Sequence, residues 1–136
     1  MPAAVTLIRA DGLLPAVPYA VAATVPPEAR LVVLAGACPL DAHGRVTAVG
    51  DVAGQTTACL ATMGTALRAA GAELADVVFV RVLVASSMRD DLATAWDVVH
   101  EAFGDHEPPG TLMGVTVLGW EHQLVEIEAV AAVLDV

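Results

Sequence analysis

Two stretches of helical periodicity, each flanked by short strand-like segments, limit the folds that this chain can adopt more than any other feature. In the first stretch, apolar residues recur at helical spacing from 52 to 70, with Asp51 placed as an N-cap and Gly71 as a stop. In the second, Ser87 and Asp90 resemble a capping box. The apolar stripe of that second stretch comprises Met88, Leu92, Trp96, Val99 and Phe103. The sequence therefore predicts two helices.

The remaining apolar segments have the length and the Val-rich composition of strands. The expected strands are 5–8, 19–24, 31–35, 76–84, 111–118 and 124–134. This order predicts one α+β domain, residues 1–136, with two helices on one face of a mixed sheet. Because the helices cover only one face, the other face is expected to be covered in an oligomer.

The composition supports that expectation. Hydrophobic residues make up 57% of the 136 residues, but aromatic residues only 4%, so Val, Ala and Leu must build the core. A domain of this size has limited interior in which to bury so much apolar surface. Part of that surface is therefore expected to contact another subunit.

The charge balance excludes some functions. The formal net charge is −10, and all six basic residues are arginine, so no lysine is available to form a Schiff base. An acidic chain also repels phosphate backbones, so no nucleic-acid partner is expected.

No targeting or membrane segment is predicted. The first fourteen residues include Arg9 and Asp11 and contain no long apolar run, which argues against a signal peptide or a transmembrane helix. Cys38 and Cys59 are therefore expected to be reduced thiols in a cytoplasmic protein. The histidines and cysteines show no metal-ligand spacing, so no metal and no cofactor are expected.

Several separated motifs together identify a resemblance. They are Tyr19 after a proline, the strand end 34–41 (LAGACPLD), Asp51 with Gln55, the passage 69–78 (AAGAELADVV), 108–111 (PPGT) and 125–131 (VEIEAVA). In this order they resemble the Rid (YjgF/RidA) family over nearly the whole chain. That resemblance implies a chorismate-mutase-like subunit, a homotrimer, and clefts between subunits that take a small-molecule ligand.

The resemblance also implies a chemistry. Deaminating members hydrolyse enamines and imines such as 2-aminoacrylate, with an arginine that grips the substrate carboxylate and a strand glutamate that places or activates water. Glu126 matches the glutamate and Tyr19 matches a pocket tyrosine. Gly110, next to Thr111, stands where the arginine is expected.

Three further positions depart from the family pattern. Ala35 and Ala37, on either side of Gly36, replace a serine and a glutamine, and Trp96 replaces a helix asparagine. Cys38 lies where the family cleft opens, either as a functional thiol or as a small packed residue. Trp96 fits core packing or the pocket, and Glu126 fits a cleft or a solvated strand face.

Three functions remain open from the sequence. The first is a repurposed Rid enzyme that acts on a small reactive imine-, enamine-type or other biosynthetic intermediate, with Glu126 as acid/base, rather than a standard 2-iminoacid deaminase. The second is a non-catalytic trimer that binds a metabolite or a partner. The third, a ribonuclease activity, is opposed by the charge.

Overall fold

Two helices, separated by one strand, lie between strands at either end of the chain, as the periodicity predicts. The computed structural model describes residues 3–9 and 17–135. Its elements are β1 (Thr6–Ile8), β2 (Ala22–Thr24), β3 (Arg30–Val33), α1 (Val52–Ala69), the 3-10 turn η1 (Leu74–Asp76), β4 (Val77–Val84), α2 (Arg89–Phe103), β5 (Gly110–Gly114) and β6 (Val125–Val133).

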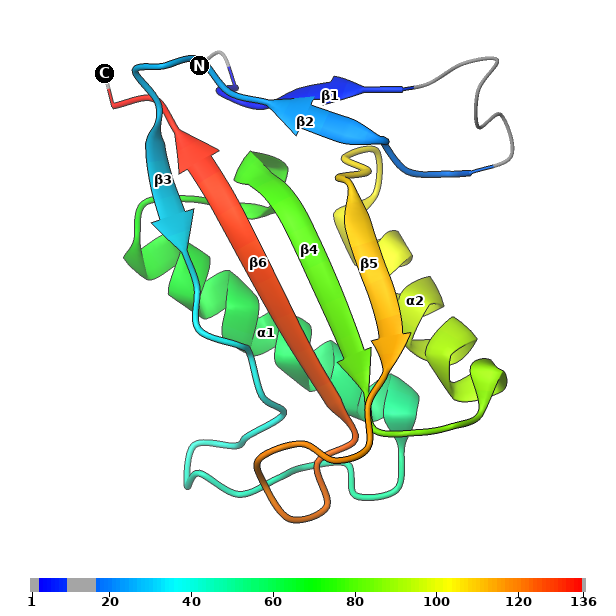
Figure 1. Ribbon diagram of the computed structural model, residues 1–136. Coiled ribbons are helices and arrows are strands. Elements are labelled where there is room, and N and C mark those ends of the chain that lie inside the picture. Colours follow the sequence, from blue (N-terminus) through cyan, green and yellow to red (C-terminus); the bar gives the residue numbers. More distant parts are fainter. Residues whose placement is uncertain (1–2, 10–16, 136) are drawn as a thin grey trace.

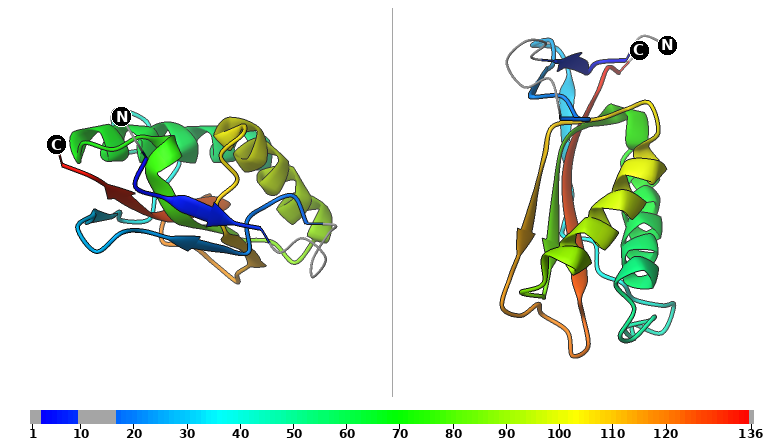
Figure 2. Two further views of the ribbon diagram at one scale, coloured as in Figure 1. Left: turned by 90° about the horizontal axis from the view of Figure 1, so that it is seen from above. Right: turned by 90° about the vertical axis from the view of Figure 1, so that its right-hand side faces the viewer.

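The main sheet has the strand order β3-β6-β4-β5 (Figure 1). Strand β6 pairs antiparallel with β3 and β4, whereas β5 pairs parallel with β4, so the sheet is mixed. Strands β1 and β2 form a separate antiparallel hairpin across one end of this sheet (Figure 1). Both helices lie on one face of the main sheet, which confirms the predicted α+β architecture (Figure 2).

The period-two alternation of β6 separates the core from the uncovered face. Val125, Ile127 and Ala129 point toward the helices and are buried, while Glu126 and Glu128 point the other way and are half-buried. No helix within residues 3–9 and 17–135 has both the length and the apolar surface that a membrane crossing requires.

The ends of α1 follow the sequence. The Asp51 carboxylate accepts a hydrogen bond from the backbone N–H of Gly54 at 3.0 Å, as an N-cap does. The helix ends at Ala69, and Gly71 adopts a φ of 79°, a left-handed conformation that glycine allows without strain. Cys59 is fully buried on the apolar face of this helix.

The start of α2 differs from the expectation. The predicted Ser87–Asp90 capping box is wrong, because the pairing is made by the neighbouring residues. The Ser86 hydroxyl donates to Asp91 at 2.6 Å and accepts from the backbone N–H of Met88 at 3.0 Å. Met88 is consequently the N-cap and is exposed, so it does not belong to the buried stripe.

The edge strand β5 is shorter than the predicted segment 111–118. Its only neighbour in the main sheet is β4, which ends at Val84 opposite Gly114. One further backbone bond, from the Val115 N–H to the Val84 carbonyl, closes the pairing. The segment that follows Val115 has no partner strand among the described residues, and Val117 is exposed.

A buried glutamine joins α1 to the turn before β6. Gln55 has no exposed surface, and its amide oxygen accepts from the backbone N–H of Leu124 at 2.7 Å. Its amide nitrogen donates to the carbonyl of His122 at 2.9 Å and to that of Ala48 at 3.4 Å. One side chain therefore satisfies three backbone groups from two loops.

We expect Gln55→Leu to lower the free energy of unfolding by about 2–4 kcal/mol, because it removes three hydrogen bonds made by a fully buried side chain. Urea titration followed by circular dichroism measures this. Thr57→Ala is the matched control, since the exposed Thr57 hydroxyl bonds only to Ala53 within the helix. That change should cost less than about 0.5 kcal/mol. Equal losses in the two variants would contradict the bridging role of Gln55.

Candidate functional site

The Glu126 carboxylate lies on the uncovered face of the sheet with one oxygen already engaged. The Cys38 thiol donates to Glu126 Oε1 at 3.2 Å, and the Gln123 amide donates to the same oxygen at 3.2 Å. Gln123 is itself nearly buried, donates to the Val125 carbonyl and accepts from the backbone N–H of Trp120. These contacts fix Oε1, and no hydrogen bond from the part of the chain that the structure describes reaches Oε2.

The segment after β3 brings Gly36 and Cys38 to Glu126 because it continues alongside β6. The N–H of Ala37 donates to the Ile127 carbonyl at 2.7 Å, and the N–H of Ile127 donates back at 3.1 Å. A Cβ on Gly36 would lie 2.4 Å from Glu126 Oε2. The glycine therefore makes room for the carboxylate, a reason for this residue that the sequence alone does not reveal.

The surroundings of Cys38 keep its thiol protonated. Burial, then the hydrogen bond to Glu126 and the negative charge of Glu126, raise the pKa of Cys38. Cys38 therefore acts as a hydrogen-bond donor toward the carboxylate rather than as a standing thiolate. Burial also raises the pKa of Cys59 to about 12, consistent with its place in the core.

A second group of predicted site residues lines a cavity of about 390 Å³ at the β5 edge of the sheet. It comprises Tyr19, Trp96, Gly110 and Thr111, together with Leu112. The rings of Tyr19 and Trp96 meet edge to face, with centroids 5.7 Å apart. Trp96 is half-buried, so it serves both the packing of α2 and the wall of this cavity.

Gly110 on β5 lies too close to β4 for a side chain to fit without displacing β4. A Cβ at this position would lie 2.8 Å from the Val80 carbonyl oxygen and 2.8 Å from a Val80 methyl group. An arginine here would force backbone atoms of β4 and β5 apart. The pairing of β4 with β5 therefore favours glycine at position 110.

The two groups do not meet within one chain. Strand β4 lies between Glu126 on β6 and Gly110 on β5, which is about 10 Å across at a strand spacing of about 4.8 Å. Glu126 is opposite Leu83, and Leu83 is opposite Met113, so Gly110 also lies three residues further along β5. The single chain therefore carries two separate half-sites.

Other residues complete the comparison with the sequence predictions. Ala35 is exposed beside Gly36 and brings no polar group to Glu126. Gln123 was missed, because nothing in the turn 119–123 marks one polar residue as the partner of a strand glutamate. Arg30 pairs with Asp135 at 2.9 Å. Arg81, which lies opposite Thr111 in the sheet, pairs with Glu128 at 3.2 Å.

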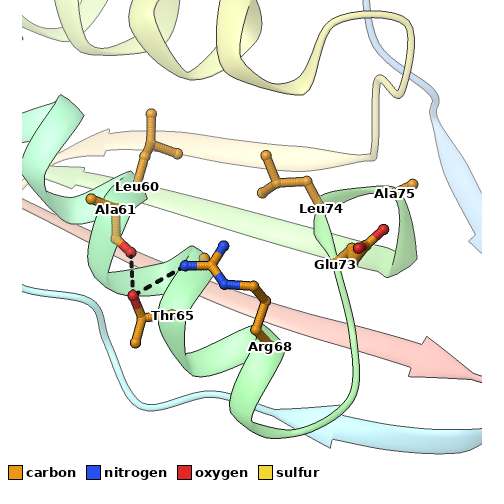
Figure 3. Close-up of a pocket in the computed structure, with 8 residues that line it drawn as sticks. Leu60, Ala61, Thr65, Arg68, Glu73, Leu74 and Ala75 are labelled. Carbon is orange, nitrogen blue, oxygen red and sulfur yellow. Dashed lines mark hydrogen bonds between the residues drawn. The ribbon is translucent and has the colours of Figure 1, made fainter.

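A groove of about 510 Å³ beside α1 and η1 contains none of these residues (Figure 3). Its only basic side chain, Arg68, contacts the Thr65 hydroxyl at 3.4 Å, and that hydroxyl donates to the Ala61 carbonyl (Figure 3). Arg68 is exposed, and its single side-chain contact is weak. The two half-sites, not this groove, hold the chemically distinctive residues.

The contact between the Cys38 thiol and the Glu126 carboxylate should control how fast iodoacetamide, which attacks thiolates, alkylates Cys38. In Glu126→Gln the negative charge is gone, so the pKa of Cys38 should fall and its alkylation at pH 8 should accelerate by roughly threefold to tenfold. Peptide mass spectrometry separates Cys38 from Cys59, whose buried thiol should remain unmodified in the folded protein. An unchanged or slower rate at Cys38 would show that Glu126 does not act on this thiol.

The sequence model of the family described as endoribonuclease L-PSP matches residues 10–133. Among curated proteins none matches the chain. Among solved structures, the Rid-family protein YyfB from Yersinia pestis is 28% identical with a TM-score of 0.85, over 96% of this chain and 99% of that chain.

Two further structures extend the likeness. A member of the YjgF/YER057c/UK114 family from Mycobacterium tuberculosis is 35% identical, with a TM-score of 0.64, over 95% of this chain and 99% of that one. YjgF from E. coli is 26% identical, with a TM-score of 0.66, over 96% and 98%. Since the family model spans most of the sequence, the chain belongs to the endoribonuclease L-PSP family, the Rid/YjgF family that its motifs resemble.

Proposed function

We propose that this protein is a homotrimeric Rid-family enzyme that acts on a small reactive imine- or enamine-type metabolite in a cleft between subunits. The observation that carries the proposal is the half-buried Glu126, whose Oε1 is held by Cys38 and Gln123 while Oε2 accepts no hydrogen bond from residues 3–9 and 17–135. A fixed carboxylate with one free oxygen is suited to move a proton to or from a bound substrate or water.

The trimer is supported by the apolar character of the uncovered sheet face. Leu31 is 57% exposed, Val33 is 75% exposed and Met113 is 37% exposed, all on strands of the main sheet. Apolar side chains gathered on one face favour association, because burying them releases ordered water. Association would also let the half-site of one subunit meet the complementary half-site of its neighbour.

The lost arginine argues against standard 2-iminoacid deamination. Gly110 offers no charge to a substrate carboxylate, and the Val80 carbonyl leaves no room for a longer residue at that position. In a partly desolvated cleft, a missing charged pair costs about 2–5 kcal/mol of substrate binding. We therefore propose a substrate that lacks the carboxylate of 2-iminoacids.

Cleavage of RNA, which the name of the family suggests, is not supported by the net charge of the chain. The chain carries a net charge of −10, and nucleic-acid binding depends on neutralising phosphates with basic side chains. A non-catalytic trimer that binds a metabolite is the remaining alternative. It needs the same cleft but no proton transfer, so a substitution that removes only the base distinguishes the two.

Multi-angle light scattering should give a mass of about 42 kDa, three times the 13.9 kDa chain. Val33→Glu should shift that mass toward the monomer, because it places a charge on the proposed interface. The control is Ala66→Glu on the exposed side of α1, which should leave the mass unchanged. A monomer for the unmodified protein at micromolar concentration would rule out the intersubunit cleft.

Glu126→Gln should keep the melting temperature and the oligomer mass but lower turnover by roughly 10²–10⁴, as expected for loss of a general base. Ammonia release is the assay, with 2-aminoacrylate and a panel of imines without a carboxylate. Glu128→Gln removes a carboxylate from the same face and is the control, with less than a tenfold effect. Full activity of Glu126→Gln, or 2-aminoacrylate turnover equal to that of an arginine-bearing relative, would contradict the proposal.

A further inference from the structure

We propose that the cleft selects a small organic cation, such as an alkylammonium or a protonated imine, and discriminates against carboxylates. This inference rests on the proposed function, since it needs the half-sites of neighbouring subunits to form one cleft. It goes beyond that function by assigning the charge of the ligand. Each half-site contributes a separate physical argument.

The aromatic half-site favours positive charge. Tyr19 and Trp96 line the cavity of about 390 Å³ together with Gly110, Thr111 and Leu112, none of which carries a charge. Aromatic faces attract cations within about 6 Å of the ring centre, and Trp attracts them most strongly. The cavity volume also suits a small ligand rather than a polymer.

The carboxylate half-site favours a hydrogen-bond donor. Glu126 Oε1 already accepts two bonds, from the Cys38 thiol and the Gln123 amide, whereas no protein donor within residues 3–9 and 17–135 bonds to Oε2. In the same part of the chain, Glu126 makes no ion pair with any basic side chain. A half-buried anion in this state binds a cationic N–H group most strongly, because the bond is charge-assisted.

Two arginines, Arg81 and Arg9, are paired with carboxylates. Arg81, the arginine on β4 between the two half-sites, pairs with Glu128 and lies 5.6 Å from the centre of the Phe79 ring. Arg9 pairs with Glu107 at 3.4 Å. The net charge of −10 adds a long-range attraction for cations.

A matched pair of probes tests whether the cleft prefers a positively or a negatively charged ligand. Isobutylammonium and isovalerate share the same branched alkyl group, and differ in having an ammonium or a carboxylate. Titration into Trp120→Phe leaves Trp96 as the only indole, so its fluorescence reports on the aromatic half-site. Isobutylammonium should bind at least roughly tenfold more tightly than isovalerate.

Two substitutions assign the preference to the cleft. Glu126→Gln should weaken isobutylammonium binding by roughly tenfold, because a charged acceptor becomes neutral. Thr111→Arg should weaken it as well and improve isovalerate binding, because it adds a cation at the cavity without the clash at Gly110. Glu28→Gln removes an exposed carboxylate from the turn before β3 and should leave both affinities unchanged.

Isovalerate that binds as tightly as isobutylammonium, or tighter, would overturn the inference. So would isobutylammonium binding that is unaffected by Glu126→Gln in an intact trimer. Neither result depends on turnover, so absence of imine hydrolysis counts only against the proposed enzyme activity. A monomeric protein would remove the shared cleft and the role of Glu126 in this selection, while the fluorescence of Trp96 still reports which charge the aromatic cavity prefers.

Discussion

Strand β6 imposes the constraint on which the other parts of this molecule depend. It is the inner strand that pairs with both β3 and β4, and its side chains alternate strictly between the two faces of the sheet. Val125 and Ile127 complete the core under the helices, so Glu126, which lies between them in the strand, points to the opposite face. The Glu126 carboxylate is thus positioned by the same pairing that holds the core together.

Around that strand, close backbone contacts rather than long side chains shape the half-sites. Gly36 leaves the space that the Glu126 carboxylate fills, and Gly110 lies against the Val80 carbonyl. Gln55 and Gln123 are buried amides that tie the turn before β6 to its surroundings. Rigid backbone and satisfied amides hold a charged group in place with little loss of side-chain entropy on binding.

The placement of charge gives the molecule its chemical character. Arg30 and Arg81 are paired with carboxylates, residue 110 is an uncharged glycine, and the cavity lined by Tyr19 and Trp96 carries no charged side chain. What remains is one oriented carboxylate and a pair of aromatic rings. The charge of this combination is negative, whereas a site that binds an anionic imino acid needs a positive charge.

Local patterns in the sequence determined the two helices and the outward direction of Glu126, because each follows from periodicity within a single element. The order of the elements along the chain predicted the mixed sheet. The motifs also determined the family. Only the tertiary structure decided that Ser86 and Asp91, rather than Ser87 and Asp90, form the hydrogen bond at the start of α2, and that β5 stops where β4 ends. It also decided that Cys38 and Gln123 share Glu126 Oε1, because these residues lie 88 and 3 positions from Glu126 and meet only through strand pairing and a turn.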